Sequence, residues 1–268
     1  MPKLKVNGAN IHYEISGEGS ETIVFAHGLL WSGKMFAAQV AALHDRYRCI
    51  TFDFRGQGQS EVTAVGYDQD SLAEDAWGVI KSLDAAPCHF VGLSMGGFVG
   101  MRLAIRYPEL LKSLILLETS ADPEPKENLG RYRMLNFIAR WFGIRPVAGR
   151  IMPIMFGQTF LHDPARAAER ELWKQRLIEN DRIGITRAVV GTIEREGVYE
   201  QISRITTPTL ILVGDEDVAT VPEKSRRIQA QISGSKLVMI PKAGHSSSIE
   251  EATAVNQAIL TFLNQLKP

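Results

Sequence analysis

The feature that most constrains the fold is a serine placed where a buried strand must turn at once into a helix. The apolar run Phe90–Leu93 predicts the strand, and Phe98–Ile105 predicts a helix that is apolar on almost every side. Gly92 and Gly96 flank Ser94 at the spacing of a strand–turn–helix so tight that a side chain at either position would clash. Such a turn lifts the serine hydroxyl above the edge of a sheet. The pattern therefore predicts an exposed nucleophile on an α/β scaffold.

Strands and helices alternate on both sides of this turn. The expected strands are Leu4–Val6, Ile11–Ile15, Thr22–Ala26, Cys49–Phe52, Phe90–Leu93, Ser113–Leu117, Thr209–Val213 and Leu237–Ile240. The expected helices are Met35–Leu43, Leu72–Leu83, Phe98–Ile105, Glu223–Gln231 and Glu251–Leu266. Apolar strands separated by helices are typical of a mostly parallel sheet with helices on both faces. The first two strands are the exception, since Asn7-Gly8 between them predicts a hairpin.

The alternation stops in the middle of the chain, where a Pro- and charge-rich turn is followed by several helical patterns. We therefore predict a core domain from residues 1–120 and 206–268, with a helical cap, residues 121–205, inserted between two of its strands. Two apolar stripes in the cap are expected to pack inside it and to turn some apolar surface toward a substrate pocket. They are Met134, Leu135, Ile138, Trp141 and Phe142, and Ile151, Met152, Ile154, Met155 and Phe156.

Composition argues against several classes of function. Among 268 residues, 30 basic side chains balance 30 acidic ones, so no net field attracts nucleic acid or an anionic membrane. No stretch is apolar enough to span a bilayer, and the N-terminal residues lack the apolar core of a signal peptide. Cys49 and Cys88 fall in predicted buried strands and are expected to be free thiols. We expect a cytoplasmic protein with no metal, no cofactor, and no nucleic-acid or membrane partner, and leave its oligomeric state open.

Two glycine-containing loops resemble nucleotide-binding motifs but lack residues that those motifs need. Gly28–Lys34 has the spacing of a phosphate loop, yet Met35 stands where a magnesium-binding Ser or Thr belongs, and bulky residues fill the loop. Gly17–Thr22 lacks the third glycine of a dinucleotide site. Nucleotide hydrolysis and dehydrogenase chemistry are therefore not expected.

A serine becomes a nucleophile when a neutral imidazole takes its proton and a carboxylate holds that imidazole in the right tautomer. His245 is the candidate base for Ser94, because it follows a glycine in a loop at the carboxyl end of a strand, where open α/β sheets gather their sites. The expected acid is Asp217, in the loop after Thr209–Val213. Asp215 in the same loop and Glu118 at an earlier strand end are the alternatives.

A tetrahedral intermediate needs two N–H donors for its oxyanion. The candidates are the backbone amides of Met95, which begins the helix after Ser94, and Leu29, in the loop after Thr22–Ala26. Gly28 lets this loop approach closely. His27 is expected to hold the loop by hydrogen bonding.

These motifs together resemble the α/β-hydrolase superfamily, and within it the 3-oxoadipate enol-lactonases and related carboxylesterases. The order Ser94, Asp217, His245 is the nucleophile–acid–base order of that superfamily. The resemblance implies the α/β-hydrolase fold and a small-molecule ester or lactone as substrate. It covers almost the whole chain outside the cap and rests on His27-Gly28, Asp53–Ser60, Gly92–Gly97, Gly214–Asp217 and Gly244-His245.

The sequence thus predicts a serine hydrolase that cleaves carboxylic esters or lactones through an acyl-enzyme intermediate. The same three side chains also suit a cofactor-free haloperoxidase or perhydrolase, or a carbon–carbon bond hydrolase. An alternative of another class is a ligand receptor with vestigial hydrolase activity, since fold alone does not establish turnover.

Overall fold

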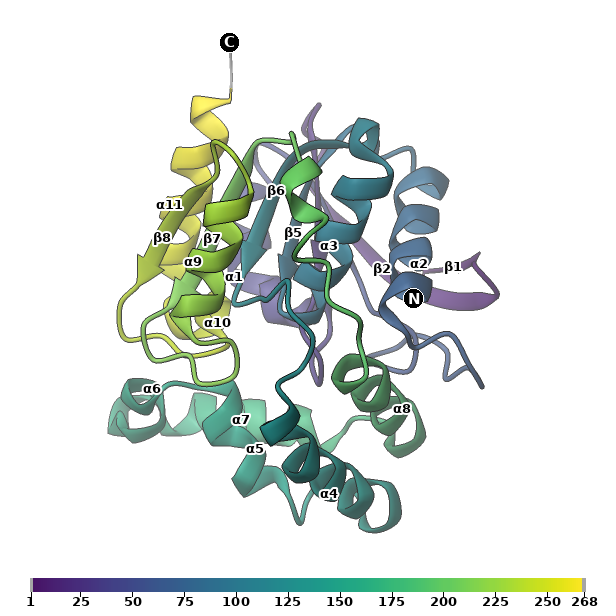
Figure 1. The fold of residues 1–268 in the computed structure, drawn as a ribbon, viewed down its shortest axis with the longest axis vertical. Coiled ribbons are helices and arrows are strands. Elements are labelled where there is room, and N and C mark those ends of the chain that lie inside the picture. The colour runs from purple at the N-terminus through teal and green to yellow at the C-terminus, as the bar shows by residue number, and fades with distance from the viewer. Residues whose placement is uncertain (1, 267–268) are drawn as a thin grey trace.

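The computed structural model describes residues 2–266, and in this part of the chain eight strands form one sheet (Figure 1). The strand order is β1-β2-β4-β3-β5-β6-β7-β8. Strands β3 to β8 pair in parallel, while β1 and β2 form an antiparallel hairpin and β2 pairs antiparallel with β4. The bounds are β1 (Lys3–Val6), β2 (Ala9–Ser16), β3 (Thr22–Ala26), β4 (Arg48–Phe52), β5 (Cys88–Leu93), β6 (Leu111–Leu117), β7 (Thr209–Gly214) and β8 (Lys236–Ile240).

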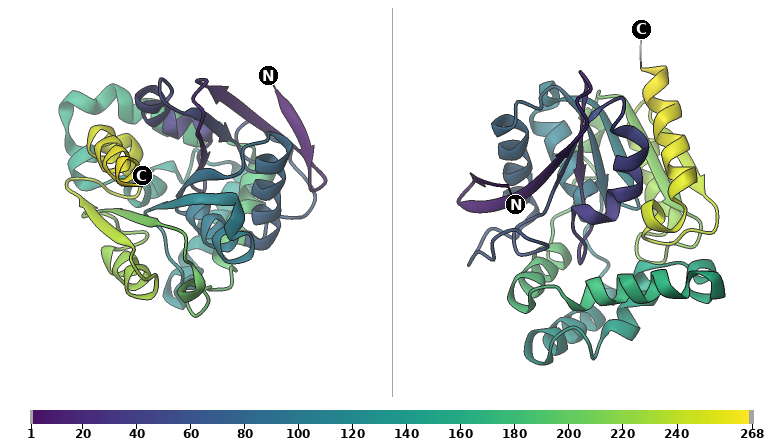
Figure 2. Two further views of the ribbon diagram at one scale, coloured as in Figure 1. Left: turned by 90° about the horizontal axis from the view of Figure 1, so that it is seen from above. Right: turned by 180° about the vertical axis from the view of Figure 1, so that it is seen from behind.

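Helices cover both faces of this sheet, which confirms the predicted architecture. Helices α1 (Ala37–Leu43) and α11 (Ala252–Gln265) pack on one face, against Ile23 and Phe25 of β3 among others. Helices α2 (Gln69–Ser82), α3 (Met95–Arg106) and α9 (Pro222–Gln231) pack on the other face, which takes the alternate strand residues. Figure 1 shows α3 and α9 in front of the sheet, and the view from behind in Figure 2 shows α1 and α11 in front of it.

Two of the expected helices are each divided into two parts in the structure. The expected helix Met35–Leu43 begins as a 3₁₀ turn, Gly33–Phe36, before α1 continues it. The expected last helix is preceded by the short α10 (Ser247–Glu250). The two helices are separated by Glu251, whose backbone is not helical. The hairpin turn is as predicted, with positive φ angles of 45° at Asn7 and 76° at Gly8.

Five further α-helices lie between β6 and β7 in the chain, and we call this segment the helical insertion. Both figures show them gathered beyond one end of the strands. Whether residues 121–205 form a separate cap domain stays a prediction. The helices are α4 (Lys126–Phe142), α5 (Ala148–Met155), α6 (Gln158–His162), α7 (Ala167–Ile178) and α8 (Arg182–Ile193).

The two apolar stripes expected to pack inside the insertion behave differently. In α4 the prediction is wrong for Met134, Trp141 and Phe142, which are 50%, 63% and 69% exposed. The helix instead turns Leu135 and Ala139, four residues apart, toward the interior. The stripe around Pro153 is buried except for the half-buried Ile154.

Two smaller expectations concern the thiols and the membrane. Cys49 and Cys88 are buried and free, as predicted, and burial raises the pKa of each thiol to about 12. None of the helices formed by residues 2–266 combines the length and the apolar character needed to cross a bilayer.

Candidate active site

Ser94 occupies a sharp turn between β5 and α3. Its backbone has a φ of 51° and a ψ of −108°, which a non-glycine residue rarely adopts and which stores strain. A side chain at Gly92 would overlap the Gly96 carbonyl, and one at Gly96 would overlap the Ala26 carbonyl. The two glycines therefore allow β5 and α3 to meet closely enough to present the serine at the carboxyl end of the sheet.

His245 lies in the loop between β8 and α10, and its ring is anchored to Asp217 in the loop after β7. The ring Nδ1 lies 3.1 Å from Asp217 Oδ1 and 3.0 Å from Oδ2. A carboxylate at Nδ1 keeps the proton on that nitrogen and leaves the Nε2 lone pair free. The Thr220 hydroxyl donates to Asp217 Oδ2 at 2.7 Å and lies 3.3 Å from His245 Nδ1.

Asp217 is held in its charged form. Burial of this carboxyl, which is 3% exposed, favours the neutral form, but the His245 ring and the hydrogen bonds of Thr220 outweigh burial and lower the pKa of Asp217. The backbone amides of Ala219 and Thr220 both donate to Oδ1, at 2.8 and 3.0 Å. An ionised, fully hydrogen-bonded carboxylate is suited to steadying an imidazolium.

Ser94 and His245 line the same cavity, whose volume is about 130 Å³. The Ser94 side chain makes no hydrogen bond to the His245 ring among residues 2–266, and both side chains are mostly buried. Catalytic hydrogen bonds often tighten only when substrate is bound. The remaining walls are largely apolar and come from α3, the insertion and the loop after β3, with Leu29, Phe98, Leu135, Ile151, Ile154 and Met155 among them.

The loop after β3 approaches Ser94 as expected. A Cβ at Gly28 would lie 3.6 Å from the Ser94 Cβ, so the backbone of this loop runs beside the serine. Leu29 lines the cavity, and within the described chain neither its amide nor that of Met95 donates to another protein group. Met95 opens α3, so its N–H lies at the positive end of the helix dipole.

His27 holds this loop, as the sequence predicted. Its Nε2 accepts a hydrogen bond from the Phe54 amide at 2.9 Å, which requires the proton on Nδ1, and Nδ1 lies 2.8 Å from the Gly28 carbonyl. Burial lowers the pKa of His27, so the neutral ring is favoured. Gln57 adds a second restraint, because its side-chain oxygen accepts from the Leu30 amide at 2.9 Å.

The two alternative acids are placed differently from Asp217. Asp215 Oδ1 accepts from the Lys242 amide at 2.7 Å and thus fastens one turn to another. Glu118 is fully buried at the end of β6, where its backbone has a φ of 41°. Burial raises the pKa of Glu118 well above its ordinary value, and the nearby Asp217 charge adds to this. A neutral Glu118 is a poor partner for an imidazolium.

Sequence reasoning missed Glu250, which braces the His245 loop. Its carboxyl accepts from the Gly244 and Ser246 amides, both at 3.0 Å, and from the Gly157 amide of the insertion at 2.7 Å. Burial raises the pKa of Glu250 to about 7, although the three amides act in the opposite direction. The only sequence signal was an acidic residue five positions after His245.

The described residues hold no group of three or more His, Cys, Asp or Glu side chains arranged to bind a metal ion. The chemistry that this arrangement supports on its own is proton transfer and nucleophilic attack. The cavity also contains a group of polar side chains from the insertion.

Comparisons with known proteins agree on one family. A family model described as alpha/beta hydrolase fold matches residues 21–252. A thermophilic esterase from Thermogutta terrifontis superimposes with a TM-score of 0.92 at 27% identity over 100% of both chains. The enol-lactonase from Burkholderia xenovorans gives 0.91 at 28% identity, over 98% of this chain and 100% of the other. A protein named putative carbamate hydrolase RutD from Stutzerimonas stutzeri is 26% identical over 94% of this chain and 96% of its own.

Proposed function

Since the chain belongs to the alpha/beta hydrolase family, we propose that it is a serine hydrolase that cleaves carboxylic esters or lactones. The observation that carries the proposal is the pairing of His245 Nδ1 with the buried, ionised Asp217 in a cavity shared with the strained Ser94. The structural likeness to an esterase and an enol-lactonase, each about as similar as the other, supports this reaction class without choosing between the two.

The proposed reaction proceeds in two steps. Ser94 Oγ attacks the substrate carbonyl carbon while His245 Nε2 takes the hydroxyl proton, and Asp217 stabilises the resulting imidazolium. The carbonyl oxygen becomes an oxyanion held by the Leu29 and Met95 amides. Collapse of the intermediate expels the alkoxide, which receives the proton from His245 and leaves an acyl group on Ser94.

Water completes the cycle. His245, neutral again, removes a proton from a water molecule that attacks the acyl carbon. The protonated His245 then gives this proton to Ser94 Oγ as the second intermediate collapses and the carboxylic acid leaves. For a lactone the alcohol stays attached to the acyl group, so the product is a single hydroxy acid. Leu29 lies on the loop that His27 and Gln57 restrain, so its donor is preorganised.

A covalent probe tests this assignment directly. A fluorophosphonate should react once per chain, and peptide mass spectrometry should place the adduct on Ser94. Hydrolysis of p-nitrophenyl acetate should disappear in proportion to labelling. Labelling of another serine, or full ester hydrolysis by a completely labelled protein, would contradict the proposed function. A panel of p-nitrophenyl esters and lactones then decides between esterase and lactonase.

A further inference from the structure

The cavity beside Ser94 contains polar side chains from the insertion that the proposed reaction does not use. Glu124 precedes α4, two residues lie on α4, one lies on α8, and Arg195 follows α8. We call these residues the polar cluster: Glu124, Tyr132, Asn136, Thr192 and Arg195.

Arg195 is fixed in place and lies close to the nucleophile turn. Its Nη1 donates to Glu124 at 3.0 Å and to the Thr192 carbonyl at 2.8 Å. Its guanidinium lies over the Phe98 ring, 4.3 Å from the centroid. The Phe98 amide donates to the Ser94 carbonyl at 3.0 Å, so one side chain separates Arg195 from the turn that carries Ser94.

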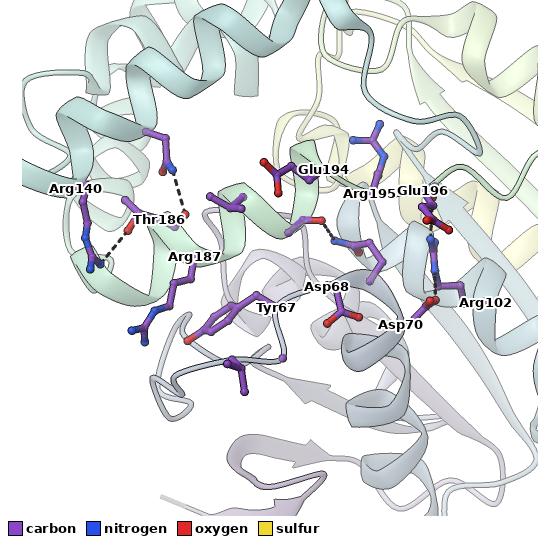
Figure 3. A pocket seen from close by; sticks show the side chains of 16 residues that line it. Tyr67, Asp68, Asp70, Arg102, Arg140, Thr186, Arg187, Glu194, Arg195 and Glu196 are labelled. Atoms are coloured by element: carbon purple, nitrogen blue, oxygen red, sulfur yellow. Dashed lines mark hydrogen bonds and ion pairs between the residues drawn. The ribbon is translucent and has the colours of Figure 1, made fainter.

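A second and larger cavity, of about 760 Å³, adjoins the polar cluster (Figure 3). It lies between α8 and the start of α2, and the two cavities share Asn136, Thr186 and Arg195 in their walls. In Figure 3 the Arg195 side chain leaves the end of α8 on the side away from Asp68. Arg195 therefore stands in the wall between a polar cavity and the cavity of Ser94.

The opposite charges of Glu124 and Arg195 balance each other. The Glu124 and Arg195 side chains are 10% and 4% exposed, so this ion pair is shielded from water. Burial lowers the pKa of Arg195, and the Glu124 charge opposes this. A ligand carboxylate placed against Arg195 would also lie beside Glu124, and it would lose its own hydration there. The electrostatics of the cluster therefore favour an uncharged group.

Three polar atoms of the cluster make no hydrogen bond within residues 2–266. Within residues 2–266, Arg195 Nε, Thr192 Oγ1 and Asn136 Oδ1 are buried atoms with no hydrogen-bond partner. Arg195 and Thr192 are 8% and 9% exposed as whole residues. Buried polar atoms are normally paired, so three unpaired ones on side chains of residues that line one cavity point to a ligand. Together they offer a donor, a hydroxyl that donates or accepts, and an acceptor.

We propose that the polar cluster binds a neutral group that both donates and accepts hydrogen bonds, such as a primary amide, on the ester that Ser94 attacks. The assignment rests on the proposed function, which it narrows to esters with an uncharged polar substituent. It also predicts that a carboxylate of the same size at the same position is rejected. Thr192, Asn136 and Arg195 then determine specificity and take no part in bond making.

Three ethyl esters of nearly equal size test the proposal. They are ethyl glutaramate, with a terminal amide, monoethyl glutarate, with a terminal carboxylate, and ethyl 5-methylhexanoate, with a terminal isopropyl group. Their hydrolysis is followed by acid release. The corresponding acetates of 4-hydroxybutanamide, 4-hydroxybutanoate and 4-methylpentanol place the same three groups on the alcohol side. In one of the two sets, kcat/KM should be about tenfold higher for the amide than for either analogue.

Glu124→Gln is the sharpest variant, because it removes the balancing charge with little change in shape. It should shift the ratio of kcat/KM values from the amide toward the carboxylate by about tenfold or more, since Arg195 is then unopposed. Glu127→Gln, an exposed position on α4, is the matched control and should leave the ratio unchanged. Thr192→Val keeps the side-chain volume and should lower kcat/KM for the amide by roughly three- to tenfold, sparing the isopropyl analogue.

The outcomes distinguish failure of the specificity site from failure of the proposed function. Preference for the isopropyl or carboxylate ester in both sets would overturn the polar cluster as a specificity site. A folded Thr192→Val protein with an unaltered preference among the three esters would overturn it as well. This measurement is still possible if Glu124→Gln fails to fold. Loss of all activity, including that on p-nitrophenyl acetate and without fluorophosphonate labelling, would instead overturn the proposed function, and the cluster's role with it.

Discussion

The edge of the sheet and the helical insertion contribute to one cavity but are built differently. At the sheet edge, Ser94, Asp217 and His245 are positioned by short connections to strands, of which β5 and β7 are buried along their whole length. Both oxygens of the Asp217 carboxylate there have hydrogen-bond partners. In the insertion, α4 buries only Leu135 and Ala139, and the side-chain oxygen of Asn136 on the same helix has no hydrogen-bond partner among residues 2–266.

This difference suggests that the sheet edge carries out the reaction and that the insertion selects the substrate. A reaction that needs atoms placed to within a fraction of an ångström is best supported by a packed sheet, where backbone and core leave little freedom. A helical insertion can change its side chains without disturbing that frame. If this division holds, substitutions at the sheet edge should alter rates for every substrate, and substitutions in the insertion should alter the ratio between substrates.

The largest effect should come from Ser94→Ala. Removing the nucleophile should lower kcat by about a millionfold on every ester, while the melting temperature stays about the same, because alanine keeps the Cβ and leaves the strained turn at Ser94 unchanged. Ser248→Ala is the matched control and should retain activity, because it removes a buried hydroxyl that has no hydrogen-bond partner within residues 2–266. A Ser94→Ala protein that still hydrolyses esters would place the chemistry elsewhere.

Asp217→Asn should have the next largest effect. An amide at this position no longer holds the proton on His245 Nδ1, and the imidazolium loses its partner, so kcat should fall by about ten-thousandfold. Glu118→Gln serves as the comparison, because a carboxyl kept neutral by burial loses no charge on this change. The assignment of the acid would have to move to β6 if Glu118→Gln were the more damaging variant.

Much of the sheet edge could be predicted from sequence because local rules act there. Glycines flanking Ser94 are required by close backbone approach, and apolar runs mark buried strands whatever surrounds them. His245 and Asp217 could be proposed because strands of a parallel sheet deliver their ends to one edge. Their contact at 3.0 Å is consistent with that reasoning.

The insertion could be predicted only in outline, since its contacts depend on tertiary packing. Which apolar residues of α4 face inward is set by where α8 lies, and so Trp141 and Phe142 were wrongly expected to be buried. The pairing of Glu124 with Arg195 spans 71 positions and has no sequence spacing to reveal it. Glu250 was missed for the same reason, because its partners are backbone amides of two loops.

Glu250 joins the two regions and offers a smaller, pH-dependent effect. Its pKa is raised from 4.5 to about 7 by burial, so the folded protein favours the protonated form. Its contribution to stability is therefore fully present below the ordinary pKa and lost as pH rises to about 7, by on the order of 3 kcal/mol. Urea unfolding at pH 5 and pH 8 should show this loss.

In Glu250→Gln the difference between the two pH values should shrink, because an amide does not titrate. Glu251→Gln is the control, since no hydrogen bond links this side chain to a backbone amide in the described part of the chain. An unchanged pH dependence in Glu250→Gln would show that the loss of stability does not come from the titration of Glu250.

The smallest expected effect compares one substitution in the two regions. Gly130 lies inside α4, where an added Cβ meets nothing within 4 Å, so Gly130→Ala should raise the free energy of unfolding by roughly 0.5–1 kcal/mol. Gly100 lies inside α3, where a Cβ would come within 3.0 Å of Leu114 and Phe90, so Gly100→Ala should lower it by about 1 kcal/mol or more. We expect urea unfolding to show changes of opposite sign in the free energy of unfolding, because α3 is densely packed on the sheet and the surface of α4 at Gly130 is open. Equal signs would mean that the packing contrast between α3 and α4 does not govern their stability.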